Sequence, residues 1–153
     1  MRRPAPHGLI AALLLAISAI LPAQAAELPT ALSAYKGKII YLDFWASWCA
    51  PCAQSFPWLN ALKSRFGDRL TVLAVNVDEH QADAQRFLEK HPAQFALAYD
   101  PKGALADHYQ IAGMPSALIL GADGRVLHQH SGFREEEIPQ YESAITAALG
   151  KTP

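Results

Sequence analysis

The stretch DFWASWCAPC, residues 43–52, decides the fold, because it places the chain's two cysteines between a strand pattern and a helix pattern. The overlapping run IIYLDFW, residues 39–45, is rich in β-branched and aromatic residues, which is the composition of a buried strand. Beyond Cys52, apolar residues recur at helical spacing as far as Phe66. Cys49 and Cys52 are therefore expected where a buried strand ends and a helix begins.

Two cysteines three residues apart can be a structural disulfide, half of a metal site or a redox-active pair. A disulfide across so small a loop stabilises a fold little, because in the chain-entropy model the effect grows with loop length. A structural zinc ion takes four ligands, usually in two pairs, and this chain has one cysteine pair. His128 and His130, on the same side of a predicted strand, could in principle complete a zinc site. Neither interpretation accounts for the pair as well as redox chemistry does.

The redox interpretation follows from the position of the cysteines at a helix start. Unpaired backbone N–H groups and the positive end of the helix dipole stabilise a thiolate there. Cys49 lies nearest to that end, so a lowered pKa and the role of nucleophile are expected for it. Cys52, one turn further on and more buried, is expected to resolve the mixed disulfide. Pro51 in the first turn stiffens the loop, and a CxxC that opens a helix in a βαβ setting predicts thiol–disulfide exchange.

Further along the chain, strand and helix patterns alternate and then end in a hairpin and a closing helix. Strands joined through a helix lie parallel, whereas a hairpin pairs its strands antiparallel. The order therefore predicts an α/β fold, with one mixed central sheet and helices on both faces. The predicted strands are 39–45, 70–77, 95–99, 116–120 and 125–130, and the predicted helices run from the cysteines to 66 and over 82–91, 104–109 and 135–149.

Residues 1–25 are predicted to be a secretory signal peptide. A basic start at 1–3 precedes an uncharged apolar run, 9–21, and the small-x-small pattern Ala-Gln-Ala at 23–25. The run is shorter than the roughly 20 apolar residues of a membrane span, which favours cleavage over an uncleaved membrane anchor. The folded domain is then 26–153, and the expected location is the bacterial periplasm.

The composition is that of one ordinary domain. The chain has 153 residues, of which 51% are hydrophobic and 18% charged, so it can bury a sizeable core and is not a disordered tail. A formal net charge of −1 without a basic patch argues against a nucleic-acid partner.

Four features together resemble the thioredoxin superfamily. Residues 48–52 (WCAPC), preceded by 43–46 (DFWA), are similar to its active-site signature. Pro57 matches the proline within the active-site helix, and 113–115 (GMP) matches the cis-proline element that lies against the CxxC. The likeness covers roughly 31–149 and is strongest to the exported TlpA/ResA-like branch, through the segments 100–103, 109–113 and 121–124.

The resemblance implies a thioredoxin fold and a role for each matching residue. Asp43 would be the acid beneath Cys52 that moves its proton. Trp48 would be a contact surface for the incoming protein. Pro115 would be cis and would leave the Met114 backbone free to pair with a substrate strand. The catalytic residues are thus expected to be Cys49, Cys52, Asp43 and Pro115, and the substrate-binding residues Trp48, Ala50, Pro51 and Met114.

The sequence departs from the family pattern at three positions, one of which is Met114, bulkier than the usual residue before the cis-proline. Many thioredoxins have a lysine on the second strand near the buried acid, but here residues 73–75 (LAV) are apolar. The cytochrome-maturation subgroup tends to have an acidic residue after the cis-proline, and here that residue is Ser116.

The expected function is that of a periplasmic thiol:disulfide oxidoreductase. Ala50 and Pro51 add no charge between the cysteines, which favours a reductant over an oxidant, as the resemblance does. Such a reductant needs exported proteins with disulfides as substrates and a membrane electron donor of the DsbD/CcdA type. A monomer is expected, with no cofactor beyond the redox-active Cys49–Cys52 disulfide and no metal.

The alternative function is Cu(I) binding and delivery. Thiolates and thioethers suit Cu(I), and Cys49, Cys52 and Met114 would supply both kinds of sulfur.

Overall fold

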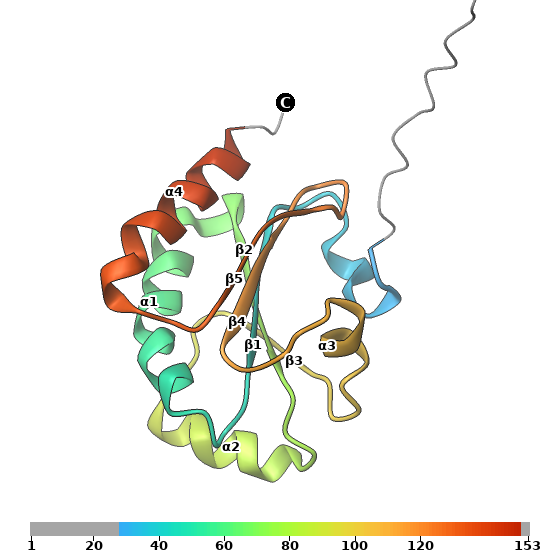
Figure 1. The fold of residues 1–153 in the computed structure, drawn as a ribbon, viewed down its shortest axis with the longest axis vertical. Helices are drawn as coiled ribbons and strands as arrows, with labels where there is room; N and C mark the ends of the chain where they lie inside the picture. The colour runs from blue at the N-terminus through green and yellow to red at the C-terminus, as the bar shows by residue number, and fades with distance from the viewer. Residues whose placement is uncertain (1–27, 151–153) are drawn as a thin grey trace, which may run out of the picture.

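The computed structural model describes residues 28–150 and shows a central sheet with helices on both sides (Figure 1). The predicted signal peptide, residues 1–25, lies outside the described residues. Within residues 28–150, no helix combines the length and the apolar character needed to cross a membrane.

Every strand and helix expected between residues 39 and 149 is present, with small shifts at the ends. The strands are β1 (Ile40–Trp45), β2 (Thr71–Asn76), β3 (Ala96–Tyr99), β4 (Ser116–Leu120) and β5 (Val126–Ser131). The α-helices are α1 (Ala50–Phe66), α2 (Gln81–Lys90), α3 (Ala104–His108) and α4 (Ile138–Leu149). Short 3-10 segments cover Thr30–Tyr35, Gly67–Arg69 and Glu135–Glu137.

The five strands form one mixed sheet in the order β3-β2-β1-β4-β5. β1 and β2 pair in parallel, as do β2 and β3, whereas β4 pairs antiparallel with β1 and with β5. β1 is thus central, and its residue Asp43 lies between Ala74 of β2 and Ala117 of β4. The mixed sheet predicted from the order of elements is confirmed.

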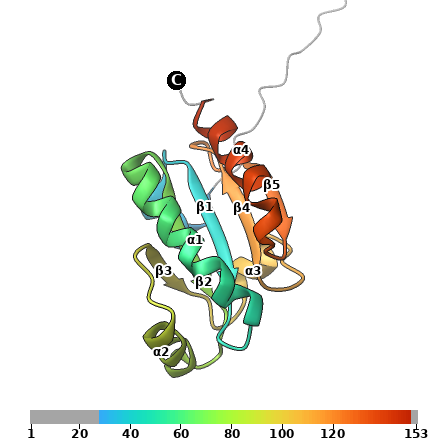
Figure 2. The same ribbon diagram turned by 90° about the vertical axis from the view of Figure 1, so that its left-hand side faces the viewer.

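The larger core lies on the face of the sheet covered by α1, α2 and α4 (Figures 1 and 2). Side chains alternate along a strand, so Tyr41 and Trp45 of β1 point to this face. Phe56 of α1 packs against the rings of Trp45, Phe87 and Phe95, with centroid distances of 5.1, 5.1 and 5.2 Å. This aromatic cluster holds α1, and with it the cysteines, against the end of β1.

A smaller core lies on the opposite face, against α3 and the first 3-10 segment. Phe44 of β1 packs there with Leu32, Leu105 and Tyr109. Because both faces are covered, every residue of β1 is buried, including the carboxylate residue Asp43.

The start of the last helix differs from the prediction. The sequence pattern predicts a helix from residue 135, but α4 begins at Ile138, after the 3-10 segment Glu135–Glu137. Pro139 has no N–H to donate to the carbonyl of Glu135, and its ring would clash with that carbonyl in an α-helix. The proline is therefore tolerated only in the first turn, so the α-helix begins there.

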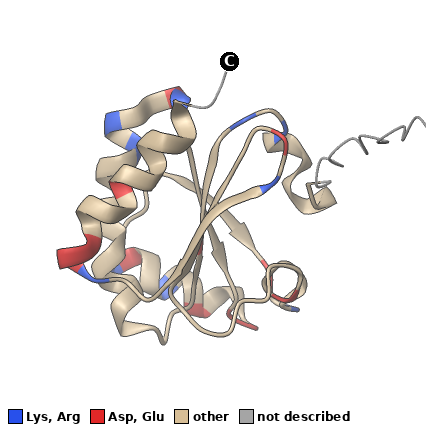
Figure 3. Ribbon diagram, turned by 45° about the horizontal axis from the view of Figure 1, so that its top comes forward, with Lys and Arg blue, Asp and Glu red and all other residues tan. Residues whose placement is uncertain are grey.

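Acidic and basic residues are scattered over the helices and the loops (Figure 3). Several form exposed ion pairs with near neighbours, such as Arg134 with Glu137 and Arg125 with Asp123.

Candidate active site

Cys49 lies at the junction that the sequence predicts, between the end of β1 and the start of α1. It is the residue that caps α1, and its Sγ accepts a hydrogen bond from the backbone N–H of Cys52 at 3.2 Å. Pro51 occupies the first turn. The two sulfurs are joined in a disulfide, 2.05 Å apart. The N–H groups and the dipole of α1 therefore act on the Cys49 sulfur, where they stabilise negative charge.

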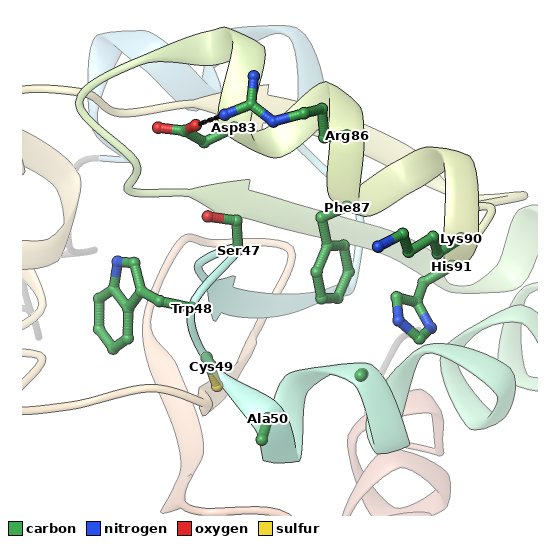
Figure 4. Close-up of a pocket in the computed structure, with 10 residues that line it drawn as sticks. Ser47, Trp48, Cys49, Ala50, Asp83, Arg86, Phe87, Lys90 and His91 are labelled. Carbon is green, nitrogen blue, oxygen red and sulfur yellow. Dashed lines mark hydrogen bonds and ion pairs between the residues drawn. The ribbon is translucent and has the colours of Figure 1, made fainter.

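The two cysteines differ in their access to the surface. Cys52 is fully enclosed, with 0% of its surface exposed, and Cys49 is 4% exposed. Cys49 lines a surface hollow between α1 and α2 (Figure 4). Around it Trp48, Ala50 and Pro51 are exposed, and Trp48 is the most prominent at 70%. This geometry favours attack at Cys49, with Cys52 behind it.

Asp43 is a buried acid on the active-site face of the sheet. Alternation along β1 places it on the same face as Tyr41 and Trp45, in the core to which Cys52 also belongs. Its Oδ2 has no hydrogen-bond partner among residues 28–150. Burial raises the pKa of this carboxyl well above its ordinary value of 3.8. Many thioredoxins have a lysine on the second strand, near this acid, whose positive charge would lower the pKa of the carboxyl. Here the neighbour on that strand is the uncharged Ala74, so the pKa of Asp43 stays raised and its carboxylate is a better proton acceptor.

The segment before Cys49 is held by Asp78, a residue that the sequence analysis did not single out. Asp78 follows β2 and is 6% exposed. Its carboxylate accepts hydrogen bonds from the Ser47 backbone N–H at 3.0 and 3.2 Å and from the Ser47 hydroxyl at 2.9 Å. Asn76 Nδ2 donates a further bond at 2.8 Å. The sequence contained one signal for this role. Asn76 and Asp78 come at the carboxyl end of the predicted strand 70–77, and that strand was predicted to lie parallel to the strand before Cys49.

The loop before β4 contains the expected cis peptide bond, Met114–Pro115. The Ser116 hydroxyl donates a hydrogen bond to the Gly113 carbonyl at 2.7 Å, and the Gly132 N–H donates to the Pro115 carbonyl at 2.8 Å. Ser116 is thus occupied in closing its own loop. The Met114 side chain is partly buried and packs against both cores.

His130, one of the two histidines that could have completed a zinc site, has another use. His130 Nδ1 lies 3.1 Å from the Gly132 carbonyl, which can only accept, so this nitrogen carries the proton. Nε2 then accepts from the Tyr41 hydroxyl at 2.8 Å, and the ring stacks on Tyr141 at 4.1 Å. Nε2 thus joins β5 to β1, and Nδ1 is bonded to the residue that follows β5. Residues 28–150 contain no group of three or more metal-ligand side chains that could hold an ion.

The sequence profile of the Redoxin family matches residues 18–145. The chain belongs to the Redoxin family. This redoxin is 27% identical over 117 residues to the thiol-disulfide oxidoreductase ResA of Bacillus thuringiensis. The aligned region covers 75% of this chain and 68% of that relative. It is 34% identical over 113 residues to a DsbE homologue of Paracoccus denitrificans. That aligned region covers 69% of this chain and 61% of the homologue.

Solved structures of related proteins have the same fold. A Chlorobium tepidum structure described as thiol:disulfide interchange protein DsbE is 46% identical, with a TM-score of 0.75 over 78% of this chain and 85% of that one. The exposed lipoprotein thioredoxin of Streptococcus pneumoniae is 31% identical, with a TM-score of 0.65 over 78% and 89%. The redoxin has a thioredoxin fold and is a thiol:disulfide oxidoreductase of the ResA/DsbE type, as its sequence predicts.

Proposed function

We propose that this redoxin works in the periplasm as a reductant of disulfides in exported proteins. The observation that carries the proposal is the Cys49–Cys52 pair at the N-terminus of α1, with Cys49 at a surface hollow and Cys52 enclosed. The predicted signal peptide supports the location, and so does the exposed lipoprotein among its relatives.

In the reduced protein, the Cys49 thiolate attacks one sulfur of the partner's disulfide. A bond forms between Cys49 and the partner, the partner's own S–S bond breaks, and its departing sulfur takes up a proton. The partner chain would lie over the exposed side chains of Trp48, Ala50 and Pro51. The backbone of Met114, beside the cis-proline Pro115, would pair with it.

Cys52 completes the exchange. Its thiol would give a proton to the Asp43 carboxylate, because burial raises the pKa of that carboxyl and so makes it a better proton acceptor. The Cys52 thiolate attacks Cys49 Sγ, the bond to the partner breaks, and the partner's second sulfur leaves and is protonated. Two electrons have passed to the partner, and the redoxin is left with the Cys49–Cys52 disulfide.

The reducing direction rests on the residues between the cysteines. Neither Ala50 nor Pro51 can hydrogen-bond a thiolate through its side chain or place a positive charge beside it. The reduced form therefore gains no extra stability from them, which keeps the dithiol a good electron donor. A membrane dithiol donor of the DsbD/CcdA type would then restore the reduced protein, and one monomer carries all the residues of the cycle.

Cysteine variants test the exchange. Purified wild-type protein should catalyse insulin reduction by dithiothreitol, and Cys49→Ser should abolish that turnover. Cys52→Ser should instead accumulate mixed disulfides with its native partners, which mass spectrometry can identify. Full turnover by Cys49→Ser would contradict the mechanism, and so would tight stoichiometric Cu(I) binding by a protein that reduces no insulin.

The direction is tested separately by redox equilibrium with glutathione. We expect a reduction potential closer to that of thioredoxin, about −270 mV, than to that of the oxidant DsbA, about −120 mV. A value near that of DsbA would reverse the proposed direction while leaving the exchange chemistry intact.

A further inference from the structure

The hollow beside Cys49 has features that thiol–disulfide exchange alone does not need. Its volume is about 470 Å³, and it lies between α2 and the segment Ser47–Ala50 (Figure 4). Phe87, only 8% exposed, and Ala53 supply an apolar part of its wall. Cys49 is itself one of the residues that line the hollow.

The α2 side of the hollow carries an excess of positive charge. Arg86, Lys90 and His91 line it, and Asp83 is its one carboxylate among the described residues. Asp83 is already paired with Arg86. Lys90 forms no ion pair with any residue between 28 and 150. Figure 4 shows Phe87, Lys90 and His91 extending from α2 on the side that faces the start of α1.

We propose that this hollow is a specificity site, which binds an acidic side chain of the partner protein close to the cysteine that Cys49 attacks. The inference rests on the proposed function and adds the chemical class of the substrate segment. An apolar wall beside an unpaired ammonium group suits a glutamate, whose methylene groups pack on Phe87 while its carboxylate meets Lys90.

A protein segment fits the hollow better than a free small anion does. A single exposed charge pair gives little affinity by itself. A segment held in a mixed disulfide at Cys49 has a high effective concentration at the hollow, because Cys49 is one of the lining residues. The charge contact then selects among partners and speeds their approach rather than holding them permanently.

Matched peptides test the inference. Two disulfide-bridged peptides would be compared, identical except that glutamates flank the bridge in one and glutamines in the other. The reduced wild-type protein should reduce the glutamate peptide about two- to fivefold faster at low ionic strength. The ratio should fall towards one in high salt, where exposed charges are screened.

Variants at an exposed position show where the preference arises. Lys90→Gln should remove most of the glutamate preference, and Lys90→Glu should reverse it. The control is Lys38→Gln, an exposed lysine before β1 at the end of that strand remote from Cys49, which should keep the wild-type ratio.

The outcomes separate this inference from the proposed function. Equal rates for the two wild-type reactions would overturn the specificity site and leave the reductase proposal standing. A preference that survives both Lys90 variants would overturn it too. If neither peptide nor insulin were reduced, the proposed function itself would fail, and the inference with it.

Discussion

Asp43 is the residue whose physical state bears most directly on the chemistry. It is the acidic residue of a strand buried on both faces, and one of its carboxylate oxygens has no hydrogen-bond partner within the part of the chain that the structure describes. A buried carboxylate without a partner costs free energy, and the cost falls when the group takes up a proton. In the mechanism proposed above, the same property makes the Asp43 carboxylate a stronger proton acceptor for the Cys52 thiol than an exposed aspartate would be.

The raised pKa of Asp43 makes folding depend on pH in a definite direction. An acid with a raised folded-state pKa binds its proton more tightly when folded than when unfolded. Its stabilising contribution is therefore complete below the ordinary value of 3.8 and is lost as the pH rises through the raised value. The wild-type protein should lose stability over that range as the buried charge forms.

Replacing Asp43 by asparagine tests this directly. Asp43→Asn cannot ionise, so the variant should lack the wild-type loss of stability and should gain about 1–3 kcal/mol relative to it at alkaline pH. Urea unfolding at several pH values measures the difference. The variant should also resolve mixed disulfides about 100-fold more slowly, since general acid–base catalysis contributes that much or more. Parallel pH curves for the two proteins would contradict a buried, titrating Asp43.

At the scale of elements, the active site depends on how α1 is joined to β1. The joining segment is held by the hydrogen bonds between Ser47 and Asp78, and Asp78 lies two residues beyond the end of the neighbouring strand β2. The position of Cys49 therefore depends on the parallel pairing of β1 with β2.

Removing Asp78 should loosen this junction. Asp78→Ala leaves the Ser47 N–H and hydroxyl without their acceptor, and we expect a loss of about 1–3 kcal/mol in the free energy of unfolding. Insulin reduction should fall about tenfold or more at temperatures where the variant is fully folded, because a small misplacement of reacting groups is costly. The pH dependence of Cys49 alkylation should shift as well.

Ser47→Ala is the matched control for Asp78→Ala. It removes the hydroxyl bond but keeps the two contacts from the backbone N–H. Its effects on stability and turnover should be clearly smaller. Equal effects would mean that the hydroxyl alone matters, and unchanged turnover in Asp78→Ala would refute the positioning role.

At the scale of the whole molecule, one sheet is shared by two cores. The strands β1, β2 and β4 supply side chains to both faces, so neither core can come apart without exposing the sheet to water. We therefore expect the two cores to unfold together.

Truncations on opposite faces test this coupling. Phe56→Ala on the α1 side should cost about 3–5 kcal/mol, and Leu73→Ala on the α3 side about 2–5 kcal/mol. Both should move a single urea transition to a lower midpoint with little change in slope. Tryptophan fluorescence and circular dichroism should report the same midpoint, whereas separate transitions would show that the cores are independent.

The sequence by itself determined the order of the elements and the chemistry of the CxxC pair. Both are local properties: the strand pattern at 39–45, the helical spacing after Cys52 and the capping position of Cys49 depend on residues near one another in the chain. The start of α4 was missed although its cause, Pro139, is also local.

Only the tertiary structure decided which distant residues meet at the site. Asp78 lies 31 positions from Ser47, and His130 lies 89 from Tyr41. Lys90 comes to the hollow beside Cys49 because α2 packs through Phe87 on the aromatic core. No pattern in one segment encodes such contacts, because they arise from the packing of the helices on the sheet, which brings side chains together that the chain keeps apart.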